Sequence, residues 1–203
     1  EIKSKSKWSG EILNRRKDGS LINQWISITS LHNQEEDISH NYLALFTDLT
    51  QIRETQNKIE FMAFHDSLTK LHNKSYLETI LNTKEEKTLI LLNINNFSYI
   101  NTAYGFDIGD EILINISKIL KNNFNVDTIC KINSDEFALV FRKKISIEEK
   151  IAEIQNFFMK NLIILGKIKL NITFSYGAVF GKDNLLRKTA TALKEAKENG
   201  KNR

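Results

Sequence analysis

The stretch that most restricts the fold of this chain is residues 130–141, CKINSDEFALVF. Two apolar runs, residues 129–132 and 137–141, flank the polar residues 133–136. This pattern predicts a β-hairpin with two adjacent carboxylates at its tip. Because the segment FALVF has no polar position, we expect its strand to be buried on both faces.

The carboxylates at the tip, Asp135 and Glu136, allow two interpretations. A buried sheet that holds adjacent carboxylates at an exposed tip suits the chemistry of metal ions or phosphates. An ordinary acidic turn in contact with solvent has the same composition. The tip alone does not decide between them, so the rest of the chain has to.

Length and composition limit the class of protein. A chain of 203 residues allows one large domain, or one domain with a fragment of another. The single cysteine, Cys130, excludes an internal disulfide and is expected to be a buried apolar filler. The net charge of +4 is spread along the chain, and basic and aromatic residues do not interleave, so we expect no nucleic-acid partner.

The sequence shows no sign of membrane insertion. No apolar run approaches the length of a membrane span, and no signal peptide is recognisable. We therefore expect a cytoplasmic segment without membrane contact. A membrane anchor elsewhere in a longer protein stays open.

Residues 1–47 are predicted to form three strands. They are expected over residues 11–16, 21–31 and 41–47, with an Asp-Gly turn at 17–20 and a polar loop at 32–39. Three antiparallel strands do not make a robust domain alone, so this segment is expected to be the end of something larger.

The same segment resembles the C-terminal half of a PAS sensor domain. The resemblance rests on Trp8, Gly10 and the run NRRKDGS at residues 14–20, closing on FTDLT at residues 46–50. It implies that most of a PAS ligand pocket would come from residues outside this segment. Trp8 and Trp25 are candidates for stacking on a ligand, but we expect them to pack within the protein.

Residues 48–64 are predicted to form a helix that Asp48 or Thr50 caps. Its apolar residues recur at spacings of three and four, which gives a short coiled-coil seam with one polar position. The seam residues are Leu49, Ile52, Gln56, Ile59 and Ala63, with Met62 beside them. The seam favours a signalling coiled coil, and hence a homodimer joined through this helix. An amphipathic helix folded onto its own domain is the alternative.

From residue 65 onward the expected order of elements is α, β, α, α, β, β, α, β, β, α, which is typical of an α/β sandwich. Helices are expected over residues 73–81, 111–122, 147–158 and 184–199, and a strand pair with a break over 167–180. The run TLILLN at residues 88–93 has no polar interruption before its end, so we expect it to lie centrally in the sheet.

Two motifs in this part resemble those of GGDEF domains, the diguanylate cyclase superfamily. The tip NSDEF is similar to the signature GGDEF, with Asn133 and Ser134 in place of two glycines. The run HDSLTKLHNK is similar to the family's entry motif HDxLTxLxNR. Within it, His65 and His72 could be proposed as a metal pair, but their spacing and the lack of a further nearby ligand argue against that.

The resemblance covers about residues 61–203. It implies an α/β (α+β) fold with a ferredoxin-like palm, similar to that of nucleotidyl cyclases. It also divides the chain into a PAS fragment at 1–47, a signalling linker helix at 48–64 and a GGDEF domain at 65–203.

The resemblance implies a reaction in which two GTP molecules, one on each of two facing monomers, condense to cyclic di-GMP with divalent ions that neutralise the phosphates. The family pattern DxDxFKxINDxxGHxxGD falls on residues 93–110. Asn101 and Asp110 match its guanine-binding pair, and Phe97 matches its phenylalanine. A carboxylate accepts from the N1–H and amino group of guanine, and an amide both donates and accepts. Lys197 and Lys201 match residues that contact phosphate; taken alone, they would be a solvated helix end.

The metal positions depart from the family pattern. Asn93 stands where the resemblance places a metal-binding aspartate, and a neutral amide is a weak ligand for Mg²⁺. Asp135 is left as the main anionic metal ligand, and Asp135 and Glu136 are expected to be vestigial catalytic residues. Ser134 is expected to strain the backbone and to put a Cβ where a phosphate approaches. Further replacements are Asn95 for aspartate, Ser98 for lysine and Phe106 for histidine. We therefore expect a weakened Mg²⁺ site and little or no cyclase activity.

The family's product-inhibition motif, RxxD, falls on residues 124–127, FNVD. The arginine is missing, so we expect no inhibitory cyclic di-GMP site there. A protein that makes no product would have no use for one.

Three hypotheses for the function follow. The first is a degenerate GGDEF domain in cyclic di-GMP signalling, which binds GTP as an effector or acts as a relay and dimerisation module. In a longer protein it could precede a cyclic di-GMP phosphodiesterase (EAL) domain. The second is an active diguanylate cyclase, and the third is a purely structural interaction domain that binds no nucleotide.

Overall fold

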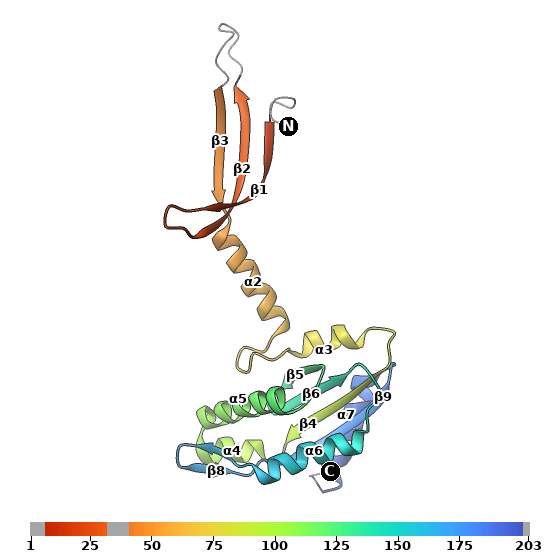
Figure 1. Ribbon diagram of the computed structural model, residues 1–203. Helices are drawn as coiled ribbons and strands as arrows, with labels where there is room; N and C mark the ends of the chain where they lie inside the picture. The colour runs from red at the N-terminus through yellow and green to blue at the C-terminus, as the bar shows by residue number, and fades with distance from the viewer. Residues whose placement is uncertain (1–6, 32–40, 201–203) are drawn as a thin grey trace. The chain divides into compact units, whose positions relative to one another are not determined.

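The computed structural model describes residues 7–31 and 41–200. The chain divides into two compact units, Glu1–Phe61 and Met62–Arg203 (Figure 1). In the described parts of the chain, no helix combines the length and the apolar character that a membrane crossing requires.

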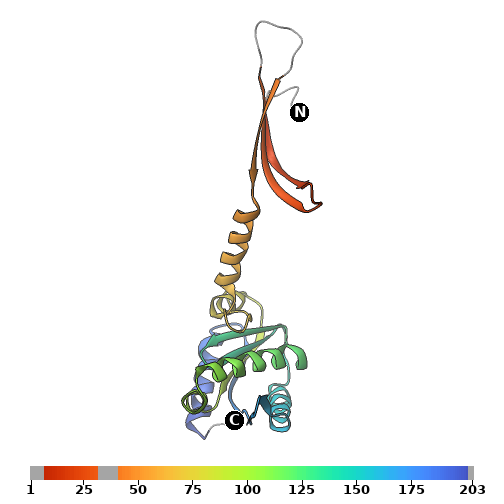
Figure 2. The ribbon, with the colours of Figure 1, turned by 90° about the vertical axis from the view of Figure 1, so that its left-hand side faces the viewer.

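The N-terminal unit contains the predicted three-stranded antiparallel sheet. Its strands, in the order β1-β2-β3, are Lys7–Arg15, Leu21–Leu31 and Asn41–Asp48. β1 begins earlier than expected because it pairs with β2 from Lys7 onward. Figure 2 shows the twist of this sheet, in which the β1–β2 hairpin curls away from β3. The predicted polar loop at 32–39 lies outside the described residues.

Apolar side chains lie on both faces of this sheet. Ile22 and Ile26 are buried on one face. On that face the ring of Trp8 lies over Gly10, with Cζ2 only 2.9 Å from where a Cβ of residue 10 would be. On the opposite face Trp25 is 46% exposed. The expected packing of the two tryptophans therefore holds for Trp8 and is wrong for Trp25.

Helix α2, Thr50–Phe64, follows the sheet directly. Asp48 caps it as predicted, because its Oδ1 accepts a hydrogen bond of 2.8 Å from the backbone N–H of Thr50. No described residue of α2 is buried, and the seam side chains Ile52 and Ile59 are exposed. A homodimer through this seam stays a prediction.

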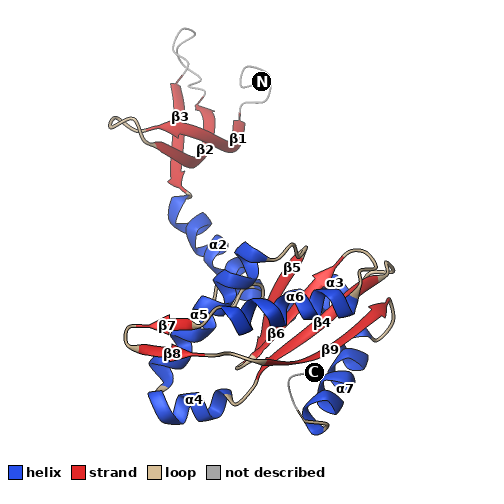
Figure 3. Cartoon of the chain, turned by 60° about the horizontal axis from the view of Figure 1, so that its bottom comes forward, coloured by secondary structure: helices blue, strands red, loops and turns tan. Residues whose placement is uncertain are grey.

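The C-terminal unit is built on a four-stranded antiparallel sheet in the order β5-β6-β4-β9, with helices on both faces (Figure 3). The strands are β4 (Lys87–Ile94), β5 (Thr128–Asn133), β6 (Glu136–Phe141), β7 (Ile163–Leu165), β8 (Ile168–Leu170) and β9 (Phe174–Gly181). The helices are α3 (Lys74–Leu81), α4 (Phe97–Tyr104), α5 (Phe106–Asn123), α6 (Ile147–Lys160) and α7 (Leu185–Glu198). One core lies between the sheet and α4, α5 and α6, and the other lies between the sheet and α3 and α7.

Strand β4 is central in this sheet, as predicted. All of its residues are buried, including the polar Thr88 and Asn93. Its alternate residues enter the two cores, Ile90 on the side of α5 and Leu91 on the side of α7. The segment FALVF of β6 is also buried throughout, which confirms the expectation that both of its faces are covered.

Two predicted elements differ from the structure. The helix expected from Glu111 begins at Phe106, because Gly105, with a φ of +90°, joins α4 to α5 and the chain continues as helix. The two strands expected within residues 167–180 are present as β8 and β9, with the expected break between them, but they do not pair with each other: β8 forms a hairpin with β7, while β9 pairs with β4. Both β7 and β8 have only three residues, which is too short for a clear alternating pattern.

Helix α7 packs directly on β9 at Gly177. A Cβ at this position would lie 2.7 Å from Cβ of Leu193 and nearer still to the carbonyl oxygen of Thr189. These atoms belong to the backbone and the stem of α7, so they cannot give way without moving the helix. The missing side chain at Gly177 therefore sets the distance between α7 and the sheet.

We expect Gly177→Ala to destabilise the protein by about 1–3 kcal/mol, because an extra methyl group in a close-packed core forces the backbone apart. Urea unfolding followed by circular dichroism measures the loss. Gly181→Ala is the matched control on the same strand, because a Cβ there would lie 3.8 Å from Leu185, an ordinary contact. Equal stability of the two variants would contradict the close approach of α7.

Candidate functional site

One edge of the C-terminal sheet gathers the residues at the predicted metal position. β4 ends there, and Asn93 pairs with Glu136 of β6 on one side and with Ser175 of β9 on the other. The backbone N–H of Ile94 donates to the carbonyl oxygen of Asp135 over 2.9 Å, which fixes the hairpin tip against β4. Because directly paired residues share a face, Asn93 and Glu136 lie side by side.

The hairpin tip is held by its own side chains. Asn133 Nδ2 donates to Glu136 Oε2 over 2.7 Å, and Ser134 Oγ donates to Asp135 Oδ1 over 3.3 Å. Neither Asn133 nor Ser134 is among the described non-glycine residues with a positive φ. The expected backbone strain at Ser134 is therefore wrong, because this turn keeps both residues in ordinary backbone conformations. The expectation that remains for Ser134 is that its Cβ occupies space where a phosphate would approach.

Asn95, the second residue expected in place of an aspartate, is engaged in the sheet. Its side-chain amide donates to Thr173 Oγ1 over 3.0 Å and accepts from Ser175 Oγ over 2.8 Å. Its backbone N–H also donates to the carbonyl oxygen of Thr173 over 2.9 Å. Both ends of the amide are hydrogen-bonded, so Asn95 ties the end of β4 to the start of β9.

A cavity of about 550 Å³ lies beside this edge. It brings together Phe97 and Asn101 of α4, Asp110 of α5, and the tip residues Asn133 and Ser134. Its lining is completed by Asp66, Leu68, Asn73, Lys74, Ser75, Phe106, Leu113, Lys131 and Ile132. The predicted guanine-reading residues therefore share one cavity with the hairpin tip, although they come from different helices.

Asn101 lies close against α5 because Gly109 has no side chain. A Cβ at Gly109 would overlap with Oδ1 of Asn101. That oxygen is buried and, among the described residues, has no hydrogen-bond donor. A buried amide oxygen without a donor is unfavourable, and native proteins contain few of them. The described residues thus leave this oxygen of the cavity residue Asn101 without a partner.

The comparison with known families agrees with this geometry. Residues 63–203 match the family described as "Diguanylate cyclase, GGDEF domain". The chain belongs to the GGDEF family. Among solved structures it is similar to a diguanylate cyclase/phosphodiesterase from Caldicellulosiruptor saccharolyticus, with 31% identity and a TM-score of 0.65. That similarity covers 71% of this chain and 93% of the other.

Curated relatives carry the family's activity in their names. Diguanylate cyclase A of Treponema denticola is 26% identical over 194 residues, covering 84% of this chain and 52% of the relative. Diguanylate cyclase VdcA of Vibrio cholerae is 28% identical over 198 residues, covering 87% and 58%. This chain thus spans little more than half the length of these relatives. GGDEF domains act in cyclic di-GMP signalling and bind GTP and cyclic di-GMP.

The fold of the GGDEF domain is shared with more distant structures. The coiled coil and GGDEF domain of DgcB from Caulobacter crescentus, solved in complex with cyclic di-GMP, has a TM-score of 0.67 at 20% identity. The similarity covers 76% of this chain and 91% of that chain. The α+β fold predicted for the C-terminal part is therefore confirmed. The relation of the N-terminal sheet to PAS domains stays a prediction.

The edge residues of this GGDEF domain do not fit a divalent ion well, although the family uses GTP with metal ions. Asn93 supplies a neutral amide, and the carboxylate of Glu136 already accepts from Asn133. The parts of the chain that the structure describes contain no group of three His, Cys, Asp or Glu side chains able to hold a metal. The edge thus offers Mg²⁺ the carboxylates of Asp135 and Glu136, but only a neutral amide at Asn93.

Of the two lysines expected to contact phosphate, Lys197 belongs to α7. The helix passes Gly177 and runs toward the edge at which β9 pairs with Asn93. Lys197, in its last turn, is exposed and is not part of the cavity lining. Lys201 lies outside the described residues.

Sequence reasoning missed three charged residues of the cavity, Asp66, Lys74 and Lys131. Asp66 Oδ1 accepts from the backbone N–H of Thr69 over 2.7 Å and from its Oγ1 over 2.6 Å, which holds the loop before α3. Lys131 is 7% exposed and interrupts an otherwise apolar strand. A charge within an apolar run was the signal that could have found it.

The window of the product-inhibition motif is used by the fold. Phe124 is buried in the core. The carboxylate of Asp127 accepts a hydrogen bond of 2.8 Å from the backbone N–H of Arg142. The expected lack of an inhibitory cyclic di-GMP site in this window stays a prediction.

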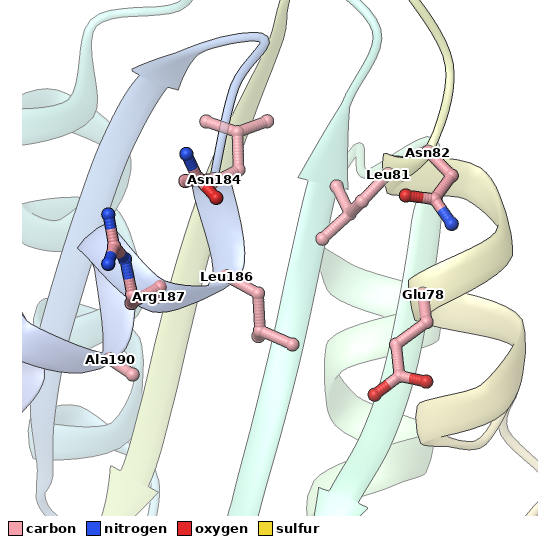
Figure 4. A pocket seen from close by; sticks show the side chains of 8 residues that line it. Glu78, Leu81, Asn82, Asn184, Leu186, Arg187 and Ala190 are labelled. Carbon is pink, nitrogen blue, oxygen red and sulfur yellow. The ribbon is translucent and has the colours of Figure 1, made fainter.

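A second cavity, of about 530 Å³, lies between the end of α3 and the start of α7 (Figure 4). Glu78 and Asn82 line it from the side of α3, and Asn184 and Arg187 from the side of α7. None of the predicted site residues lines it, so this cavity is separate from the one beside the hairpin tip.

His65 and His72 lie together at the loop before α3. Their ring centroids are 4.5 Å apart, and the ring of His72 stacks on Tyr76 at 3.7 Å. Nδ1 of His72 is buried and has no partner within the described residues. Burial, and next the charge of His65, lower the pKa of His72 below its usual value of 6.5. The neutral ring is therefore the form that the folded protein favours.

We expect the stability of the C-terminal unit to fall as the pH drops below 6.5. The pKa of His72 is lower in the folded state, so the unfolded state binds more protons in this range and gains from acidification. The stabilisation from neutral His72 is fully present above the unfolded pKa and is lost as the pH falls through the folded one. Urea unfolding at about pH 7.5 and about pH 5.5 measures the change. A loss in His72→Gln as large as in the wild type would exclude His72 as its source.

Gly109→Ala is expected to weaken GTP binding at least about tenfold, because the new Cβ displaces the Asn101 amide from the cavity. The fold itself should hold, since alanine favours a helix over glycine by about 1 kcal/mol. Calorimetric titration with GTP measures the affinity, and thermal unfolding controls for stability. Wild-type affinity in a stable variant would show that Asn101 does not take part.

Proposed function

We propose that this GGDEF domain binds GTP as a regulatory ligand and has little or no diguanylate cyclase activity. The observation that carries the proposal is the buried, donor-free Oδ1 of Asn101 in one cavity with Asp110. A guanine-reading pair is retained, while Asn93 stands at the metal position as a neutral amide. The site therefore keeps the residues for guanine recognition but has a weakened position for the metal ion that cyclase activity uses.

The chemistry of guanine matches the groups in the cavity. The carboxylate of Asp110 accepts from the N1–H and the exocyclic amino group of guanine, and Asn101 supplies an amide for the same purine edge. The ring of Phe97, at the cavity wall, offers an apolar surface to the base. Adenine has no N1–H, so it would leave the buried polar groups unpaired.

The regulatory role rests on how the domain is attached. The exposed seam of α2, with Ile52 and Ile59, enters the GGDEF domain at its first residues. Such a seam favours a homodimer, with the helix as a relay between the N-terminal sheet and the GTP site. We place the protein in the cytoplasmic part of cyclic di-GMP signalling, with a PAS-type sensor before the helix. In the full-length protein, a phosphodiesterase domain of the EAL type is a candidate target of the relay.

An active cyclase is the second candidate, and the intact pair Asp135 and Glu136 favours it. The curated relatives named above are also called diguanylate cyclases. In that case Mg²⁺ would be bound by Asp135 and the substrate's phosphates despite the amide at Asn93. A purely structural domain is the third possibility, and it requires that no nucleotide binds.

Calorimetry with GTP, with and without Mg²⁺, tests the proposal on the wild type and on Asp110→Ala. We expect binding at about micromolar Kd in the wild type, at least tenfold weakening in the variant, and no binding of ATP. Incubation with GTP and Mg²⁺ or Mn²⁺, followed by chromatography, is expected to yield no cyclic di-GMP. Measurable product would establish the active cyclase instead. Absence of GTP binding in both proteins would favour the structural domain.

A further inference from the structure

The buried ammonium of Lys131 is the most unusual charge beside the cavity. Lys131 lies in β5, directly paired with Phe137 of β6, and is 7% exposed. Its Nζ donates to the carbonyl oxygen of Asn133 and lies 5.3 Å from the centre of the Phe137 ring. A lysine buried to this degree is rare unless other groups compensate its charge.

The compensation comes from several separate parts of the chain. Burial lowers the pKa of Lys131, and four carboxylates oppose that effect and favour the charged form. These carboxylates belong to Asp66, Asp135, Glu136 and Asp110. They come from the loop before α3, the hairpin tip, β6 and α5, so the ammonium lies where these elements meet.

Lys131 is not paired tightly with any of these carboxylates. In the ranges that the structure describes, no carboxylate lies within ion-pair distance of its Nζ. An ammonium has three N–H donors, and one is used by Asn133. The remaining donors are on a side chain that lines the cavity next to the tip residues Asn133 and Ser134. They are placed to meet an anionic oxygen of a ligand held there.

We propose that Lys131 takes the place of a divalent ion in this site. Its fixed positive charge compensates the negative charge of the phosphates of a bound guanine nucleotide. The proposal rests on the proposed function, since it concerns the nucleotide bound at Asn101 and Asp110. It follows from two observations: Asn93 offers a metal ion only a neutral amide at the edge, and a buried cation already lies among the carboxylates. Guanine nucleotides therefore bind this domain without a metal ion.

A lysine in this role also limits the chemistry. An ammonium neutralises charge, but it cannot coordinate several phosphate oxygens and a hydroxyl in one octahedral shell, as Mg²⁺ does. It therefore supports binding of the nucleotide more than attack on its α-phosphate. This agrees with a domain that binds GTP as a regulatory ligand and does not convert it to cyclic di-GMP.

The test compares GTP binding in Mg²⁺ and in excess EDTA, for the wild type, Lys131→Met and Lys131→Arg. We expect the wild-type Kd to differ less than about threefold between the two conditions, and Lys131→Met to bind GTP at least about tenfold more weakly. Lys131→Arg keeps the charge and is expected to stay within about threefold of the wild type. Guanosine, titrated by NMR chemical shifts, has no phosphate and is expected to bind the wild type and Lys131→Met equally.

The outcomes separate this inference from the proposed function. If EDTA abolishes GTP binding to the wild type, a metal ion is required and the inference is wrong, while the guanine site stands. Equal GTP affinity of Lys131→Met and the wild type would overturn it in the same way. If neither GTP nor guanosine binds the wild type, both the inference and the proposed function fail. The comparison in EDTA uses only the wild type, so it holds even if Lys131→Met does not fold.

Discussion

The C-terminal unit depends on a strand that is closed to solvent on both faces. Because helices cover β4 from each side, its sequence has to be apolar almost to its end, and the chain can expose polar groups only where the strand stops. The hydrogen bond from Ile94 to Asp135 fastens the hairpin tip to that end. The carboxylates are therefore positioned by the packing of the core. This explains how the hairpin tip holds Asp135 and Glu136 at the edge where β4 ends.

Long patterns in the sequence predicted the fold where packing on both faces leaves few alternatives. The runs TLILLN and FALVF identified β4 and β6, and Asn184 and Gly200 marked the ends of α7. Glycines misled the prediction at α5, because Gly105 joins two helices and Gly109 makes room for a neighbouring side chain. In the sequence alone, a glycine with either of these roles cannot be distinguished from a glycine in a loop.

The family motifs also grouped part of the candidate site. Phe97, Asn101 and Asp110, which the resemblance assigns to guanine binding, line one cavity in the structure, and their role stays a prediction. Sequence reasoning failed at Ser134, because the backbone conformation of a two-residue turn depends on how the tip is tied to β4. It also missed Lys131, whose meaning depends on carboxylates from distant parts of the sequence. The charges that surround a residue are known only once the fold is assembled, so the pattern along one strand cannot predict them.

The contact at Gly177 has a consequence for how this domain can evolve. α7 rests on β9 where a hydrogen atom replaces a side chain, and the far end of the same helix carries Lys197. The position of α7 is therefore set in the core, and Lys197 lies near its far end. A larger residue at position 177 would push α7 off β9 and move Lys197 with it. A descendant that replaces this glycine would thus also shift the basic end of the helix.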